Sequence, residues 1–460
     1  MTVPPTVNKR QRTDYTEGSI VASILKMGLP SMFGFLMQHT YSLVDTWWVS
    51  RLSDSEASVA AITFFASIHW LFFTFNNLIG PGSVALISRR YGEKSYDLVE
   101  KLTKETIVMK LALGGVFGLI GYIFAEPMLT FVGAEGVTLD LGVQYGRIMF
   151  IGMGIMYATY SIYTAMRGVA NPHQAMALML GANVLNMGLD PIFMFGYLGF
   201  PAMGIRGAAW ASVLSFTIVF LVGILLFYSG RTNVRLHLRG KERMTWESIW
   251  KITYIGIPAW IGDMSFAGAR LVLVRLVAPF GTPVVAAYGV GNQVTSIGVA
   301  MLVGIGLGLS ALIGHNIGGA KMKRAKETAD KAILLGVGLK TGMATVVFLF
   351  APEIMRMFFE SPETVHVGST MLRIFALGFP FIGAFMMIAQ VHTGVGLNGP
   401  TMVVNLINAW VLEVAPVYLL TVYFGFSELS VWWSISLAGA LSALLFYWYY
   451  QRGKWLAVSL

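Results

Sequence analysis

Two apolar stretches of the chain each carry a carboxylate whose polar neighbours share one helical face. In the first stretch, the run QHTYSLVDTWW places Gln38, Tyr41 and Asp45 at positions i, i+3 and i+7, which lie together on a helix. Pro30 precedes this face by about two turns. A proline weakens a helix because it removes a backbone hydrogen bond, so we expect a hinge at Pro30.

The second stretch repeats the spacing with different polar residues. The run GANVLNMGLDPIF places Asn183, Asn186 and Asp190 at i, i+3 and i+7, and a proline follows directly. A carboxylate at the bilayer centre costs about 2.5–3.5 kcal/mol on insertion scales. Each aspartate therefore needs a function or a partner that offsets this cost.

Together, Asp45 and Asp190 have the chemistry of an ion-coupling site. Two carboxylates in a low-dielectric site cannot both stay ionised easily, and a proton or a cation relieves their repulsion. Two structural alternatives remain open at this stage. Asp45 can cap or pair at the outer end of its helix, where Arg51 follows closely, and Asp190 can simply hydrogen-bond Asn186 or a neighbouring tyrosine.

The second half of the chain has its own polar residues inside apolar stretches: Asp263, Arg270, Asn292, Gln293, Lys340 and Glu413. Asp263 and Arg270 lie about two turns apart and can neutralise each other. Asn292 and Gln293 lie at a depth where they can face a central cleft. Lys340 is expected to extend its ammonium group toward the cytoplasmic surface.

These residues lie on elements that the composition assigns to a membrane. Of the 460 residues, 56% are hydrophobic and only 12% are charged, and there is no cysteine and hence no disulfide. A spanning helix needs about 20 mostly apolar residues. The apolar stretches predict twelve spans, near 20–50, 57–88, 105–125, 138–166, 173–197, 205–228, 249–277, 284–316, 327–350, 365–392, 400–424 and 429–450.

The loops between these spans alternate in charge. Lysine and arginine gather between spans two and three, six and seven, and eight and nine, and in the tail, whereas the alternate loops are poor in both. This alternation predicts that both chain ends lie in the cytoplasm. It also explains the net charge of +9 without a nucleic-acid partner, although each basic loop can separately attract anionic lipid.

An internal repeat relates the two halves of the chain. The segments beginning at Ser58 and Val284 align without gaps at a shift of 226 positions, which places Gly80 on Gly306 and Gly92 on Gly318. Six spans per repeat give both halves the same orientation, related by an axis along the membrane normal. We therefore expect a cytoplasmic segment 1–19, an N-lobe 20–228, a linker 229–248, a C-lobe 249–450 and a cytoplasmic tail 451–460.

The predicted fold is thus an all-α integral membrane protein with twelve transmembrane helices in two pseudo-symmetric six-helix bundles. Duplicated halves around a central site are typical of secondary transporters. The sequence has no phosphate-binding loop, no metal-binding motif and no sign of a cofactor, so an ion gradient would have to drive transport. The polar N-terminus lacks a signal-peptide cleavage site, and we expect the first helix to be retained.

The sequence resembles the multidrug and toxic compound extrusion (MATE) family over nearly its whole length. The resemblance is carried by the Gln38-to-Val49 run, by Asn186 with Asp190–Pro191, by GIRGAAWAS from Gly204, and by AAYGVGNQV with GLSALIGHNIGGA. The paired aspartates are most similar to the DinF-like branch. The resemblance implies export of cationic or amphipathic compounds in exchange for H⁺ or Na⁺, by a monomer in a prokaryotic plasma membrane.

The resemblance also implies roles for individual residues. Asp45, Asn186 and Asp190 match the polar site that binds the coupling ion, and Gln38, Tyr41 and Tyr145 match positions near it. Ser212 corresponds to a hydroxyl that is threonine in many relatives, and Asp263 lies near an acid used in another branch. Three rival functions remain: a lipid-linked-sugar flippase, a membrane-embedded enzyme and a passive channel. The seven scattered histidines argue against the enzyme, and the duplicated plan argues against the channel.

Overall fold

The computed structural model describes residues 15–237 and 244–458, except for the side chains of residues 38–43, 55 and 282. The described part is helical and contains no strand. Its first half consists of α1 (Ile20–Val49), α2 (Ser55–Thr74), η1 (Phe75–Leu78), α3 (Gly80–Gly92), α4 (Tyr96–Ile123), the short α5 (Ala125–Phe131), α6 (Gly136–Gly168), α7 (Pro172–Phe195), η2 (Tyr197–Gly199) and α8 (Ile205–Tyr228).

The second half has the same plan. It consists of α9 (Trp246–Val277), η3 (Ala278–Phe280), α10 (Thr282–Gly318), α11 (Met322–Leu349), the short α12 (Ala351–Arg356), α13 (Pro362–Val395), α14 (Gly399–Leu406), η4 (Ile407–Val414), α15 (Ala415–Tyr418), η5 (Leu419–Tyr423), α16 (Glu428–Gln451) and η6 (Lys454–Ala457). The stretch from α14 to η5 is one continuous span in which η4 and η5 are π-helical.

Eleven helical spans in the described residues are long and apolar enough to cross a membrane. The twelfth predicted span corresponds to α9, which is 32 residues long and includes Asp263, Arg270 and Arg275. It packs against α3 of the first half and α14 of the second half. It is therefore part of the packed helices despite its charges. The clearest difference from the predicted bounds is at α4, which begins at Tyr96 rather than near 105 and places Lys101 and Lys104 on the helix.

The helix ends follow from local chemistry. The side chain of Ser19 accepts a hydrogen bond from the backbone N–H of Ala22 at the start of α1, a usual N-cap contact. Helices α7 and α13 both end at a glycine with left-handed backbone, Gly196 and Gly396. Glycine is favoured there because it has no Cβ to clash.

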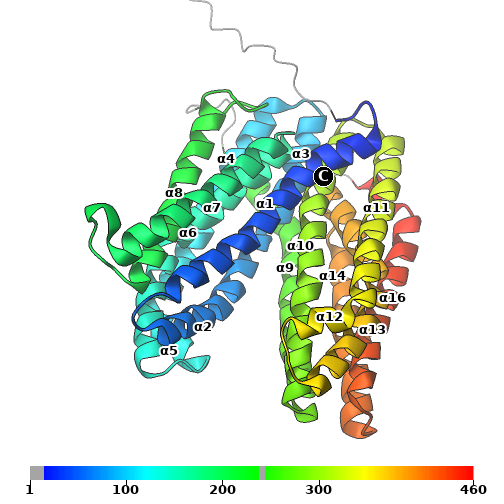
Figure 1. The fold of residues 1–460 in the computed structure, drawn as a ribbon. Helices are drawn as coiled ribbons and strands as arrows, with labels where there is room; N and C mark the ends of the chain where they lie inside the picture. The colour runs from blue at the N-terminus through cyan, green and yellow to red at the C-terminus, as the bar shows by residue number, and fades with distance from the viewer. Residues whose placement is uncertain (1–14, 238–243, 459–460) are drawn as a thin grey trace, which may run out of the picture.

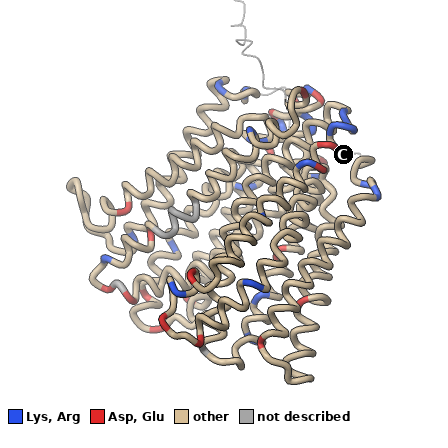
Figure 2. The backbone as a smooth tube through the Cα atoms, turned by 45° about the vertical axis from the view of Figure 1, so that its right-hand side comes forward, with Lys and Arg blue, Asp and Glu red and all other residues tan. Residues whose placement is uncertain are grey.

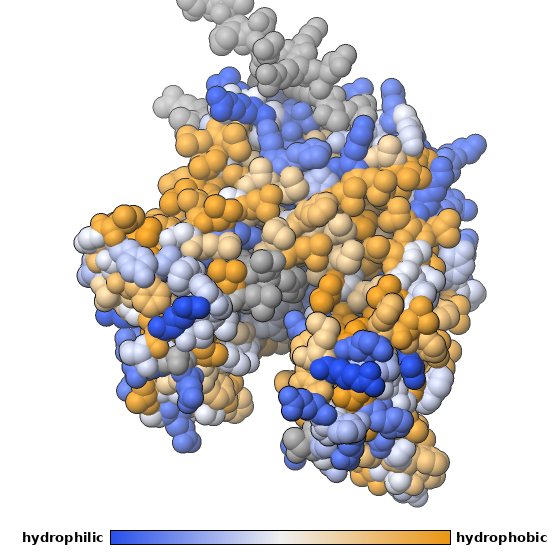
Figure 3. Space-filling model, in the orientation of Figure 1, coloured by the Kyte–Doolittle hydropathy of each residue, from blue (hydrophilic) through white to orange (hydrophobic). Residues whose placement is uncertain are grey.

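The two halves meet at one end and separate at the other. Figure 1 shows the helices of the first and second halves converging near the C-terminus and diverging toward α5 and α12. One apolar cluster joins both halves and includes Ile24 and Leu86 with Ile305 and Met387. The other two clusters each stay within one half. Figure 3 shows the hollow between the halves at the separated end.

The converging end is the predicted cytoplasmic end. Figure 2 shows lysine and arginine gathered near the C-terminus. The start of the described chain lies there as well, because the Arg324 guanidinium donates to the backbone oxygens of Gly18 and Glu17. The positive-inside rule therefore predicts that the halves are closed toward the cytoplasm and that the hollow opens outward.

Close backbone contacts at repeat-related glycines build the closed end. A Cβ added at Gly92 of α3 would collide with the backbone of His315 on α10, and one added at Gly318 of α10 would collide with the backbone of Arg89 on α3. Both pairs are related by the 226-residue repeat. The same surfaces therefore meet twice across the axis between the halves, and only glycine permits this approach.

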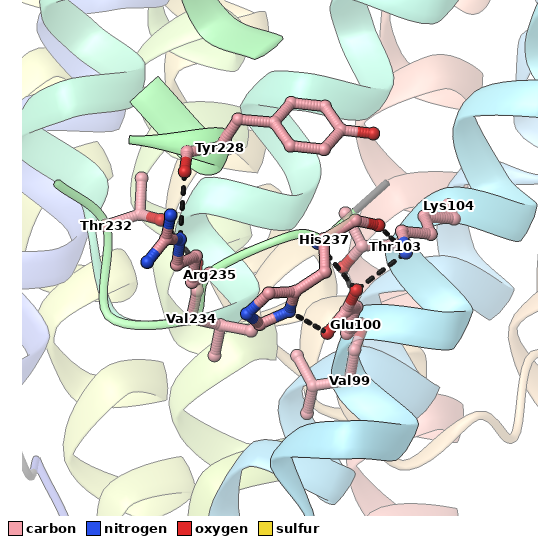
Figure 4. Close-up of polar contacts among 9 residues, drawn as sticks. All are labelled: Val99, Glu100, Thr103, Lys104, Tyr228, Thr232, Val234, Arg235 and His237. Carbon is pink, nitrogen blue, oxygen red and sulfur yellow. Dashed lines mark hydrogen bonds and ion pairs between the residues drawn. The ribbon is translucent and has the colours of Figure 1, made fainter. Parts of the chain in front are cut away.

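The segment after α8 is fastened to the first half. Figure 4 shows Glu100 of α4 accepting hydrogen bonds from the backbone N–H and ring Nδ1 of His237, at 2.7 and 2.9 Å, and from Lys104 Nζ at 2.6 Å. Arg235 donates to the backbone oxygen of Tyr228 at 3.0 Å. These contacts hold residues 228–237 against the cytoplasmic end of α4.

Candidate functional site

A buried polar site lies where α1, α7 and α8 pack together in the first half. Asp45 comes from α1, Asn186 and Asp190 from α7, and Ser212 from α8. Asn186 and Asp190 are one turn apart on the same helix, so they share the face that meets α1 and α8. The site therefore gathers three helices around two carboxylates.

The amide of Asn186 organises the site. Its Nδ2 donates to Asp190 Oδ1 and to Ser212 Oγ, each at 3.2 Å. Asp45 lies close enough to Asp190 for the two carboxylates to repel each other. Asp190 and Ser212 are 0% exposed, Asn186 is 1% exposed and Asp45 is 6% exposed. The alternative in which Asp190 hydrogen-bonds Asn186 is thus part of the geometry, not a competitor to the site.

Three acceptor oxygens in this site have no hydrogen-bond donor among the described residues. They are Asp45 Oδ1, Asn186 Oδ1 and Asp190 Oδ2. Leaving a buried acceptor unpaired costs about 1–3 kcal/mol, and more for a charged group. A small cation could contact all three oxygens at once, whereas a proton would bind one carboxylate and give it a single O–H donor. Either ion would relieve the repulsion between the carboxylates.

Asp45 does not pair with Arg51 at the outer end of α1, which was the structural alternative. Arg51 lies over the exposed ring of Trp47, 4.1 Å from its centroid, while Asp45 is buried. No lysine or arginine forms an ion pair with Asp45 or Asp190 within the described chain. The site therefore combines two acids with no compensating base.

The other predicted residues of the first half are placed less completely. Gln38 and Tyr41 lie on α1, but their side chains are outside the described residues. Tyr145 of α6 is buried, and its ring packs edge-to-face against Phe65 of α2. Asn183 is partly buried on α7, and its Nδ2 has no partner within the described part.

The intramembrane charges of the second half pair differently from the expectation. Asp263 does not neutralise Arg270. Instead, Asp263 Oδ2 accepts a hydrogen bond of 2.7 Å from Asn77 of η1 in the other half. Arg270 donates to Asn292 Oδ1 on α10 and interacts electrostatically with Glu413.

Two further residues complete the account of the predicted polar positions. Gln293 is exposed on α10. Lys340 does not extend to the surface as expected: it is 1% exposed, and its Nζ lies 4.6 Å from the ring centroid of Phe379. The cause is the packing of α11 against α13, which covers the lysine.

Sequence reasoning missed the bridge from Asn77 to Asp263. Asn77 follows Asn76 in the run FNNLIGPG, where α2 gives way to a 3₁₀ turn before α3. Paired asparagines before a Gly-Pro-Gly run signal an interruption of the span. That signal marks the turn, but not its partner in the other half.

Comparison with known proteins identifies the family of this chain. The MatE family model matches residues 30–192 and 258–419, one match in each half. The probable multidrug resistance protein YoeA of Bacillus subtilis (strain 168) is 27% identical over 92% of both chains. The multidrug export protein MepA of Staphylococcus aureus (strain MSSA476) is 26% identical over 95% of both chains.

A solved structure shows the same fold. It is described as the outward-facing conformation of a multidrug resistance MATE family transporter of the MOP superfamily. It superposes with a TM-score of 0.86 and 23% identity over 96% of this chain and 98% of the other. The predicted all-α membrane fold is confirmed.

Two repeat-related bundles that close at the basic end, with a buried acidic site in one of them, are typical of secondary transporters. The chain belongs to the MATE family. The chain is therefore a transporter and not an enzyme, as predicted from the sequence.

Proposed function

We propose that this chain exports cationic or amphipathic organic compounds from a prokaryotic cell, in exchange for H⁺ or Na⁺ bound at Asp45, Asn186, Asp190 and Ser212. The observation that carries the proposal is the set of three unpaired buried oxygens on Asp45, Asn186 and Asp190. The relatives described as multidrug export and resistance proteins support the substrate class. The paired aspartates of the first half support the DinF-like branch.

The chemistry of the site suits a single monovalent cation or a proton. Carboxylate, amide and hydroxyl oxygens are ligands that hard cations prefer, and the carboxylates can equally be protonated. Entry of either ion changes the net charge of a site that is shielded from water. This change of charge is what couples ion binding to a conformational equilibrium, because the two states of the transporter then differ in electrostatic energy.

The proposed cycle uses the architecture as follows. The two halves act as N-lobe 20–228 and C-lobe 249–450, joined by the linker 229–248. In the outward-open state, the ion enters the site on α1 and α7, and α1 bends near Pro30. The bend weakens the hold on the exported compound in the cleft. The halves then reopen toward the cytoplasm and release the ion there. Gln38, Tyr41 and Tyr145 support the ion site, and the monomer is the transporting unit.

Efflux from proteoliposomes tests this function. Purified protein is reconstituted into liposomes loaded with ethidium, and a proton gradient or a sodium gradient is imposed in separate runs. We expect ethidium efflux under at least one gradient and none in liposomes without protein. An absence of efflux under both gradients, with correctly inserted protein, would refute the proposal. The gradient that works identifies the coupling ion.

A further inference from the structure

A small cavity lies inside the second half, away from the acidic site of the first half. It has a volume of about 70 Å³ and is lined by residues of α9, α10, α13 and α16. A cavity needs roughly 10–15 Å³ to admit one water, so this one has room for an ion with a partial water shell. Its polar lining consists of Arg270, Tyr288, Asn292, Thr295 and Ser436.

The polar lining is rich in hydrogen-bond donors. The Tyr288 hydroxyl is buried and has no partner in the described residues, and the whole residue is only 3% exposed. Arg270 contributes a guanidinium with five N–H donors. It donates a hydrogen bond to Asn292 Oδ1 and lies over the ring of Phe266, 5.0 Å from the centroid. Asn292 therefore turns its acceptor toward Arg270, and its Nδ2 remains a donor.

The acceptors of the lining are weaker. Thr295 and Ser436 use their hydroxyl hydrogens on the backbone oxygens of Gly291 and Ile374, which leaves their oxygen lone pairs. Among the residues that the structure describes, no carboxylate lines the cavity. A cation would thus meet two hydroxyl oxygens and a guanidinium, whereas an anion would meet a guanidinium, a phenol and an amide.

The charges around the cavity also favour an anion. Lys340 is 1% exposed, its Nζ has no hydrogen-bond partner in the described chain, and it lies over Phe379, which lines the cavity. Glu413, on a π-helical turn, is in electrostatic contact with Arg270. Lys340 therefore adds positive charge beside a lining that carries no carboxylate, and a buried charge without a partner is costly.

We propose that this cavity binds a small inorganic anion of the halide class, held by Arg270, Tyr288 and Asn292. The anion pairs with the Arg270 guanidinium and gives the Tyr288 hydroxyl an acceptor. The site is separate from the proposed coupling site and does not depend on it. The acidic site of the first half holds unpaired acceptors and this cavity holds the unpaired hydroxyl of Tyr288, so the two sites bind ions of opposite sign.

The test is a chloride titration of the purified full-length protein in detergent, read as melting temperature. Sodium chloride is exchanged for sodium gluconate at constant sodium and ionic strength. We expect the melting temperature to rise with chloride and to saturate. Tyr288→Phe removes only the donor hydroxyl and should raise the midpoint of the titration about tenfold or more, since hydrogen bonds to charged groups are the strong ones. Tyr418→Phe, at an exposed tyrosine, should leave the midpoint unchanged.

A second pair of variants keeps the test decisive. Gly439 lines the cavity, and a Cβ added there meets nothing within 4 Å. Gly439→Asp places a negative charge beside the cavity and should abolish the chloride response, whereas Gly439→Ala should retain it. The same melting curve in chloride and gluconate would mean that the cavity holds water only, and would overturn the proposal. An unchanged titration in both Tyr288→Phe and Gly439→Asp would overturn it too. None of these readouts depends on transport.

Discussion

Replacing the glycines of the closed end should open the transporter toward the cytoplasm. In Gly92→Ala and Gly318→Ala, the new methyl group meets backbone of the other half, at His315 and Arg89 respectively. Backbone cannot rotate away as a side chain can, so the halves must separate locally. Overpacking of this kind costs typically about 1–3 kcal/mol. Because the cost falls only on the state that is closed toward the cytoplasm, the population should shift by about 5- to 150-fold toward the inward-open state.

The absence of cysteine in the sequence makes a distance measurement straightforward. Lys94 and Lys323 are exposed positions on opposite halves of the closed end. Spin labels attached through Lys94→Cys and Lys323→Cys allow their separation to be measured by pulsed electron–electron double resonance. We expect a single short distance in the parent protein and a longer population in both alanine variants. Gly115→Ala and Gly342→Ala are matched controls, since an added Cβ there meets nothing within 4 Å.

Two outcomes would refute this reasoning. The distance distributions of Gly92→Ala and Gly318→Ala could match the parent, which would mean that the glycine contacts do not hold the closed end together. Alternatively, the control variants could show the same new population, which would mean that any added methyl group loosens the bundle.

Three further perturbations test other contacts of the structure. Ser212→Ala removes the hydroxyl that accepts a hydrogen bond from Asn186 Nδ2. The loss of this hydrogen bond should cost about 1 kcal/mol of binding free energy at the site. The initial efflux rate should fall severalfold, Ser212→Thr should restore it, and equal rates would contradict the role. Glu100→Gln weakens the charge-assisted contacts to His237. Amide hydrogen exchange over 232–237 should accelerate about tenfold, and unchanged exchange would remove this fastening from the account. Asn77→Ala leaves Asp263 without its donor. Thermal melting should show a destabilisation of about 1–3 kcal/mol, and an unaltered melting curve would show that the bridge contributes nothing.

The helices and the acidic face could be predicted from the sequence because both depend on local spacing. A run of about 20 apolar residues specifies a spanning helix wherever it occurs. Asn186 and Asp190 had to share a face because they are one turn apart. The orientation in the membrane is likewise predicted from the charge of the loops. Each of these inferences needs only residues that are close together in the chain.

Contacts between the halves were beyond the same reasoning. The hydrogen bond from Asn77 to Asp263 joins residues 186 positions apart, and its formation depends on how two bundles pack. The spacing in the sequence predicted that Asp263 pairs with Arg270 on the same helix. The packing of the two halves instead brings Asn77 to Asp263. The burial of Lys340 also depends on tertiary packing, here within one half, since the ring that covers it, Phe379, lies on another helix.

The repeat illustrates both sides of this division. The alignment at a shift of 226 predicted two equivalent halves, and the glycine contacts of α3 and α10 show where the equivalence acts. The two halves differ at the acidic site of the first half and at the cavity of the second half. Ser212, Asn186 and Asp190 gather in the first half, whereas a donor-rich lining occupies the second half.

The most direct test of the coupling site compares aspartate variants in gradient-driven efflux. Asp45→Asn and Asp190→Asn keep the size of each side chain and remove its charge. Asp54→Asn changes an exposed aspartate just beyond α1 and serves as the control. Ethidium efflux under the working gradient should fall to the level of protein-free liposomes in the first two variants and persist in the third. Undiminished gradient-driven efflux by Asp45→Asn or Asp190→Asn would contradict the assignment of the coupling ion to this site.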